Sequence, residues 1–304
     1  MSRTNFVPAP QFEEYKELFK EHFNMEKRED GVLLAKMCTN GSAPAYWSEE
    51  LHRAIWQFWQ TVGADPTVEL VIFTCEGDTW LNDMDDTSWL DEIYDPGYAR
   101  YEHMYYDGRR MLISMIQNTE IPTIGIINGT GVHCELALMC DLCIMADDAV
   151  MVDPHFRGNL VPGDGIQICL RELMGIRRAN YMMLMNQAID AELAMKYNLV
   201  NEVVPKKDII KRAYEMADVI MQKPRPIRRL TSSVLRRPWK KAVADELDGA
   251  FGTEMFGDFC HGVIHAAADR DGYYDADHSA VVDDDKLEKI KAMAYEQAKN
   301  EGKQ

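Results

Sequence analysis

Strand-like and helix-like patterns alternate through the first two thirds of the chain, and this alternation limits the folds open to it. Three short apolar runs bounded by turn-forming residues predict buried strands: 31–39, 68–77 and 121–129. The segments 47–65 and 97–118 between them predict helices, and Ser48 is positioned to cap the first. Strands separated by helices usually lie parallel in one sheet. We therefore predict an α/β fold.

The two ends of the chain differ from this middle part. Residues 11–28 form a charged amphipathic pattern that predicts an N-terminal helix. After three helical segments between 166 and 199 and a closing strand at 200–205, the pattern is helical almost throughout and ends in a charged tail. We predict a core with its N-terminal helix over 1–205 and a helical C-terminal region over 206–304.

Charge and apolar content exclude some classes of function. The formal net charge is −17, from 50 acidic against 33 basic residues, which argues against nucleic acid as a partner. The apolar runs are too short to cross a membrane, and the N-terminus has no apolar core typical of a secretory signal. The seven cysteines lie mostly in apolar runs, as expected of reduced thiols. We therefore expect a cytoplasmic protein with no membrane partner.

The stretch DPHFRGNLVPGDG, residues 153–165, concentrates residues with chemical potential in a loop rich in turn formers. His155 and Asp164 stand nine positions apart on either side of a Pro-Gly turn that lets the chain double back. Two interpretations remain open for this pair. Both side chains could serve only the loop's structure, or a carboxylate could orient an imidazole that acts as a base.

A longer series of motifs runs from ING at 127–129 through CELALMCDLCIMADDAVMVDPHF and LVPGDG to NEVVP at 201–205. This series resembles the crotonase, or enoyl-CoA hydratase/isomerase, superfamily. The resemblance implies a spiral of ββα units with a helical C-terminal trimerisation region. It also implies a homotrimer or a dimer of trimers, and two backbone N–H groups that bind a thioester carbonyl.

The chain departs from the thioester-using members of that superfamily at several positions. The glycine run expected before the CEL helix is shorter at 128–135 and contains a histidine, and segment 80–85 also differs from the usual pattern. Of the two glutamates that hydratases use, Glu135 matches the first, but His155 occupies the second position. Since imidazole and carboxylate have opposite charge states, ordinary hydratase activity is not expected.

This altered pattern is similar to the β-diketone hydrolase branch of the superfamily, which cleaves a C–C bond between two carbonyls without CoA. The resemblance implies that five positions form the site: Trp47, His133, His155, Asp164 and Glu254. We expect a small cyclic 1,3-diketone as the substrate. No cofactor and no metal are expected, because the enolate on the second carbonyl accepts the electrons of the broken bond.

The chemistry of the side chains suggests a role for each. In its neutral form His155 would deprotonate water, and Asp164 would bond the other ring nitrogen. His133 and the Trp47 indole would donate hydrogen bonds to a carbonyl oxygen as it gains charge. Glu135 would hydrogen-bond His133 or a backbone amide. We also expect three aromatic side chains to line an apolar pocket for the ring: Trp80, Trp89 and Phe156.

Two alternative functions remain. The first is a CoA-dependent hydratase, isomerase or thioesterase of the same fold, which Glu135 favours and the shortened glycine run opposes. The second is a non-catalytic subunit of the same fold whose task is assembly with partners.

Overall fold

The computed structural model describes residues 6–42, 44–85, 88–89, 96–261, 292–293, 296 and 299–300. The predicted charged tail lies almost entirely outside these residues. No helix in the described part of the chain combines the length and apolarity needed to cross a bilayer.

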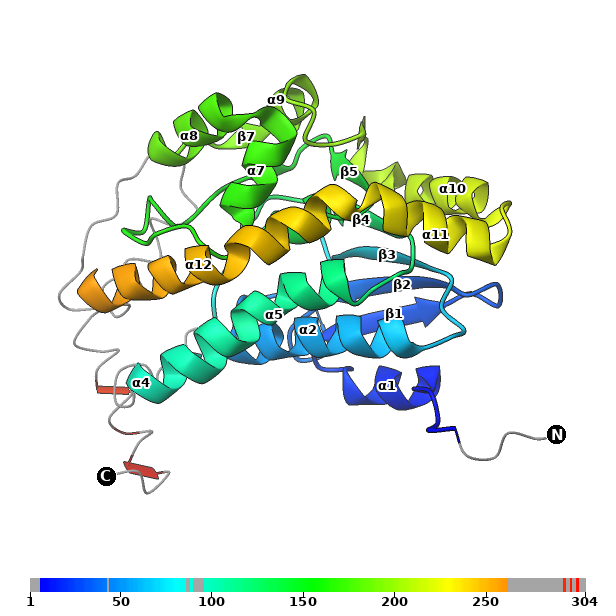
Figure 1. Cartoon of the computed structure of the whole chain (residues 1–304), viewed down its shortest axis with the longest axis horizontal. Helices are drawn as coiled ribbons and strands as arrows, with labels where there is room; N and C mark the ends of the chain where they lie inside the picture. Colours follow the sequence, from blue (N-terminus) through cyan, green and yellow to red (C-terminus); the bar gives the residue numbers. More distant parts are fainter. Residues whose placement is uncertain are drawn as a thin grey trace.

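A six-stranded sheet forms the centre of the molecule, in the order β1-β2-β3-β4-β5-β8 (Figure 1). The strands are β1 Phe23–Lys27, β2 Val32–Met37, β3 Leu70–Cys75, β4 Thr123–Ile127, β5 Leu142–Ala146 and β8 Glu202–Val204. From β2 to β8 neighbouring strands are parallel, and only β1 runs antiparallel to its neighbour. β3 and β4 are buried at every position, as expected when both faces of a sheet are covered.

The helix predicted at 47–65 is α2, Glu49–Ala64, and its predicted cap is confirmed. The Ser48 side chain accepts a hydrogen bond from the Leu51 N–H, which satisfies one of the free donors at the helix start. One face of α2 is buried, including His52, Ile55 and Phe58.

The prediction of a helix over residues 11–28 is wrong for the second half of that range. α1 spans only Phe12–Leu18, and the chain then turns into β1. Phe23 and Met25 alternate with more exposed residues, and β1 pairs with β2 along its whole length. Because this strand is short and charged on one side, its pattern of period two was hidden within the longer helical pattern.

The helix predicted at 97–118 is helical, but not uniformly α-helical. Short α-helices α4 Pro96–Ala99 and α5 Arg109–Leu112 alternate with π-helical turns η1 Arg100–Gly108 and η2 Ile113–Gln117. Such turns are uncommon and often occur near functional sites. At Gly108 a Cβ atom would lie 2.5 Å from Phe251 and 3.3 Å from His52, so glycine permits the close approach of η1 to α2.

Smaller elements follow β4 on the other side of the sheet. A two-stranded antiparallel sheet joins β6 Val150–Met151 to β7 Ile189–Asp190. Four helices accompany it: α6 Glu135–Leu138, α7 Ile166–Met174, α8 Ile176–Leu184 and α9 Ala191–Lys196. The helical segments predicted between 166 and 199 are therefore confirmed.

The described part of the C-terminal region, residues 206–261, is helical, as predicted. After η3 Lys206–Asp208, α10 Ile209–Met221 packs against β3, β4 and β5. α11 Arg225–Leu235 leads into α12 Arg237–His261, which crosses beside α5 and α7 (Figure 1). The predicted class is confirmed: an α/β fold with a mainly parallel sheet and, over 206–261, a helical C-terminal region.

Candidate active site

The predicted site residues come from four separate parts of the fold. Trp47 precedes α2, and its backbone exchanges hydrogen bonds with Asp83 and Asp85 in the segment after β3. His133 lies between β4 and α6, while His155 and Asp164 belong to the loop between β6 and α7. Glu254 lies on α12. The sheet thus brings the first three parts together, and α12 adds the fourth.

His133 has a left-handed backbone conformation, with φ of 53°, which is uncommon for a residue other than glycine. Its Nδ1 hydrogen-bonds Glu135 Oε1 at 3.1 Å and lies 2.9 Å from Asp164 Oδ2. The ring stacks on Trp47 with centroids 3.8 Å apart and planes 17° apart. Both carboxylates thus meet the same ring nitrogen, Nδ1, and hold the ring from one side.

Each of the two ring nitrogens of His155 lies close to a carboxylate. Nδ1 is 2.6 Å from Asp153 Oδ1, while Nε2 is 3.5 Å from Asp164 Oδ2 and 3.8 Å from Glu254 Oε1. The expected hydrogen bond between His155 and Asp164 is therefore corrected to an ion-pair contact. Asp153 is the residue that orients the ring, and the sequence analysis did not single it out, although it stands only two positions before His155.

Asp164 uses its two oxygens differently. Oδ1 accepts a hydrogen bond from the Ile166 N–H at the start of α7, which fixes the side chain. Oδ2 lies between the two imidazoles but receives no well-formed hydrogen bond from the described residues. Next to it, a Cβ on Gly163 would collide with the Ala250 carbonyl, so the Pro-Gly turn lies directly against α12.

The carboxylates change the charge state of both imidazoles. Burial lowers the pKa of His133, but Glu135 and Asp164 outweigh it and raise the pKa to about 9. Burial opposes Asp164 and Asp153 at His155 as well, and its pKa is also raised well above the ordinary value. Both rings are therefore cationic at neutral pH in the unliganded site, so the neutral form of His155 expected to act as the base is the minor form.

The acids of the cluster divide into two kinds. Burial raises the pKa of Asp164, but His155 and His133 hold it well below its usual range, so this residue is ionised. Burial, together with the negative charge of Asp164, raises the pKa of Glu135 against the opposing effect of His133. At Glu254 burial dominates and the pKa lies well above its usual range, even though His155 opposes the shift.

His52 belongs to the site, although the sequence analysis missed it. Its ring meets Trp47 edge to face at 4.5 Å and Trp89 at 5.1 Å. Nδ1 donates to the His103 carbonyl at 2.9 Å, and since a carbonyl can only accept, Nδ1 carries the proton. Burial lowers the pKa of His52 to about 3, so the ring is neutral. The available signal was the apolar face of α2, where a histidine stands among buried residues.

The three aromatic residues predicted to line a pocket have different surroundings. Trp89 is buried with φ of 64°, contacts His52, and has an indole N–H without a partner in the described part of the chain. Trp80 is fully buried and packs on Phe73. Phe156 is 47% exposed. The structure therefore brings Trp89 to the cluster through His52, whereas Trp80 packs into the core and Phe156 is turned largely to solvent.

Two triads of the cluster have donor atoms within 4.8 Å of one another, a spacing that a metal ion can also occupy: His133, Glu135 and Asp164; and His155, Asp164 and Glu254. In both triads, however, the contacts join a ring nitrogen to a carboxylate oxygen. A ring nitrogen that carries a proton has no lone pair for a metal. A metal ion at either triad would therefore have to displace the proton of its histidine.

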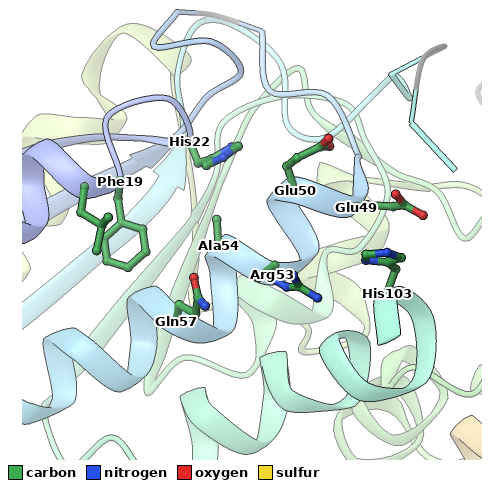
Figure 2. Close-up of a pocket in the computed structure, with 9 residues that line it drawn as sticks. Phe19, His22, Glu49, Glu50, Arg53, Ala54, Gln57 and His103 are labelled. Atoms are coloured by element: carbon green, nitrogen blue, oxygen red, sulfur yellow. The ribbon is translucent and has the colours of Figure 1, made fainter. Parts of the chain in front are cut away.

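A hollow of about 310 Å³ lies outside this cluster, between α1, α2 and η1. Figure 2 shows Glu50, Arg53 and Gln57 of α2 around it, with His22 and His103. None of the predicted site residues lines it. The hollow is therefore separate from the cluster, although His103 reaches His52 through its carbonyl.

The chain is similar to known proteins over most of its length. The family model described as enoyl-CoA hydratase/isomerase matches residues 40–262. The α subunit of the fatty acid oxidation complex of Shewanella putrefaciens is 29% identical over 219 residues. That match covers 70% of this chain but only 30% of the relative, so the chain spans less than a third of the relative's length.

Solved structures give a second comparison. A β-diketone hydrolase from the cyanobacterium Anabaena, bound to (S)-3-oxocyclohexyl acetic acid, is 27% identical with a TM-score of 0.74. The match covers 80% of this chain and 96% of that one. An enoyl-CoA hydratase/isomerase from Mycobacterium paratuberculosis has a TM-score of 0.69 at 24% identity, covering 78% and 93% of the two chains, which shows the shared fold.

Proposed function

This chain belongs to the enoyl-CoA hydratase/isomerase family, and we propose that it uses the family's fold to hydrolyse a carbon–carbon bond in a cyclic 1,3-diketone. The reaction would open the ring to a keto acid without CoA and without a metal ion. The similar hydrolase from Anabaena was solved with a molecule that carries both a ketone and a carboxylic acid. Those are the two groups that such a cleavage leaves.

One observation carries the proposal: buried carboxylate oxygens surround two imidazoles, and two of these oxygens lack hydrogen-bond donors among the described residues. Glu135 Oε2 and Glu254 Oε2 have no partner there, whereas Asp164 Oδ2 lies 2.9 Å and 3.5 Å from the two ring nitrogens. Buried acceptors of this kind are rarely left unpaired in native proteins. A water molecule with two O–H donors would satisfy them, and the neutral form of His155 would then be able to accept one of its protons.

The carbonyl that water attacks needs donors for the negative charge that develops on its oxygen. The stacked pair of Trp47 and His133 offers the indole N–H and the Nε2 side of an imidazolium. A cationic donor is stronger than a neutral one. Each such donor typically lowers the barrier by about 3 kcal/mol. The raised pKa of His133 thus suits it to this role and not to that of a base.

The raised pKa of His155 limits its action as a base, because little of the neutral form is present at neutral pH. The carboxylate of Asp153 compensates in part, since it stabilises the imidazolium formed when water loses a proton. We therefore expect kcat/KM to rise with pH from neutral into the alkaline range, in contrast to a base with an ordinary pKa.

The direct test uses a panel of cyclic 1,3-diketones of different ring size, followed by loss of their enolate absorbance. The wild-type protein should consume at least one member with neither CoA nor metal added, and the product should be the keto acid by mass spectrometry. Activity should survive dialysis against a chelator. Failure to convert any member, or loss of activity on chelation that added metal restores, would contradict the proposal.

Acyl-CoA chemistry is the second candidate, because Glu135 is retained and the matching relatives include fatty acid oxidation proteins. It predicts binding to immobilised CoA and hydration of an enoyl-CoA. The diketone proposal predicts neither. A non-catalytic assembly role predicts instead that no member of the panel reacts and that His155→Ala changes nothing measurable.

We also propose that the chain assembles as a homotrimer or a dimer of trimers. Large apolar side chains are exposed on neighbouring turns of two helices: Ile176, Tyr181 and Leu184 on α8, and Ile227, Leu230 and Val234 on α11. Exposed apolar faces of this kind are typical of subunit contacts. Light scattering of the full chain after gel filtration should give three or six times the mass of 34.8 kDa, and a monomer would contradict this proposal.

A further inference from the structure

Asp258 is a buried carboxylate to which the proposed reaction gives no role. It stands four residues after Glu254 on α12, and only 1% of its surface is exposed. Residues at this spacing share one face of a helix. Asp258 Oδ1 and Glu254 Oε2 both lack a hydrogen-bond partner in the part of the chain that the structure describes. Both carboxyl groups are therefore buried on one face of α12, and each has an oxygen that no described residue pairs.

The groups that face this pair come from three elements. The loop from β6 to α7 supplies His155, which acts electrostatically on both acids, and Asp164, which faces Glu254. His133, before α6, also acts on Glu254. From η1, Arg100 donates through Nη2 to the Asp258 carbonyl at 3.3 Å. At the intervening Gly257, a Cβ would be 2.5 Å from Val161, so this turn of α12 packs closely on the loop.

Two buried carboxylates on neighbouring turns of one helix repel each other when both are ionised, so ionisation of one opposes ionisation of the other. Arg100 favours the charged form of Asp258, whereas Glu254 also faces the ionised Asp164. Burial raises the pKa of Asp258 to about 6 and that of Glu254 well above its usual range. At neutral pH the shared proton is therefore on Glu254.

We propose that Asp258 is a positioning residue that keeps Glu254 protonated, so that Glu254 can deliver a proton to the carbanion released by C–C cleavage. The inference rests on the proposed function for its final step, and the protons balance. Water gives its hydroxyl to the acyl carbon and a proton to His155, and the electrons of the broken bond form an enolate. Glu254 protonates the enolate carbon, and His155 then returns its proton to Glu254, whose Oε1 is 3.8 Å from Nε2.

Infrared titration of the unliganded protein tests the protonation of Glu254 without any substrate. A band of a protonated carboxylic acid should be present at neutral pH in the wild type and absent in Glu254→Gln. In Asp258→Asn the band should titrate at a proton concentration roughly tenfold higher, because a like charge has been removed. Asp258→Glu should restore the wild-type titration, and Asp245→Asn, an exposed acid of the same helix, should not change it.

The inference is overturned if the wild type has no such band, or if Asp258→Asn leaves it unmoved. Circular dichroism of each variant checks that the fold is intact, and the comparison of the wild type with Glu254→Gln still decides whether Glu254 is protonated if Asp258→Asn unfolds. The pH profile with a reactive diketone tests the use of the proton. Asp258→Asn should shift the descending alkaline limb of kcat by about one pH unit, whereas a merely structural role would lower kcat equally at every pH. If no diketone reacts at all, the proposed function fails while the infrared result still decides the role of Asp258.

Discussion

The two histidines of the site are both buried among carboxylates, but they are held in opposite ways. At His133 two carboxylates meet the same nitrogen, the ring stacks on Trp47, and the backbone is in the left-handed region. At His155 each nitrogen faces a carboxylate, and the ring lies nearly perpendicular to that of His133, at 85° and 5.9 Å between centroids.

This difference separates two tasks that a 1,3-diketone requires. An imidazole anchored from one side presents its other nitrogen as a fixed donor, which suits a carbonyl oxygen that gains charge. An imidazole placed between two carboxylates can take up a proton on one side and pass one to a neighbour, because both nitrogens have acceptors within reach. The comparison teaches that burial alone does not define a histidine's role, whereas the arrangement of the acids around it does.

The largest effect should follow from removing the proposed base. His155→Ala leaves Asp153 and Glu254 in place but removes the group that accepts the proton of water. We expect kcat to fall by roughly 10³-fold, within the range typical of general bases. Steady-state rates on a reactive diketone measure the fall in kcat. Asp245→Asn changes an exposed residue of α12 and controls for nonspecific effects of a substitution. A fall in kcat of less than tenfold would contradict the assignment of His155 as the base.

A somewhat smaller loss should follow at the proposed donor. His133→Ala removes the cationic N–H and the stacking partner of Trp47, and we expect kcat to fall by about 10²-fold with little change in the pH at which activity rises. Trp47→Phe keeps the aromatic face without the N–H and should lie between this variant and the wild type. If His133→Ala instead shifts the ascending limb of the pH profile by more than a unit, His133 is the base and the comparison is reversed.

Substitution of Asp153 and substitution of Asp164 should lower the pKa values of the two histidines in different patterns. Asp153→Asn removes the carboxylate 2.6 Å from His155, so the pKa of His155 should fall, with little change at His133. Asp164→Asn should lower the pKa of both rings, because Asp164 acts on both. NMR of labelled histidine rings measures these shifts, which we expect to be about one unit or more. Equal effects of the two variants on both rings would show that the rings titrate as one unit.

The last prediction concerns stability, and its sign follows from the raised pKa of His133. A folded pKa of about 9 against about 6.5 in the unfolded chain means that the proton stabilises the fold fully below pH 6.5 and that this contribution is lost as pH rises through about 9. Its size is on the order of 3 kcal/mol. Urea unfolding between pH 6 and 10 should show a steeper alkaline loss for the wild type than for His133→Gln, and identical slopes would contradict this.

Most of the fold could be predicted from the sequence where patterns are long and local. The buried strands β2, β3 and β4 and the cap at Ser48 follow directly from apolar runs and a hydroxyl at a helix start. β1 could not be predicted, because five residues of mixed character carry little periodicity until a partner strand covers one face.

The site was accessible to sequence reasoning as a set of residues, but its pairing was not. Asp153 and Asp164 are both near His155 in the loop, and only the path of the backbone places the first on Nδ1 and the second between two rings. His52 was hidden because a histidine on the buried face of a helix has the same pattern as a core residue. The charge states of the site histidines could not be predicted either, because they depend on acids that come from distant segments of the chain.

The crossing of α12 beside the loop of Asp164 has a consequence for biosynthesis. The sheet and the loop can collapse once residues up to 205 have left the ribosome, but Glu254 and Asp258 emerge some fifty residues later. Until then the cluster has imidazoles without its last two acids, and the groove that α12 fills stays open to solvent. The proposed site is therefore incomplete until the final long helix docks.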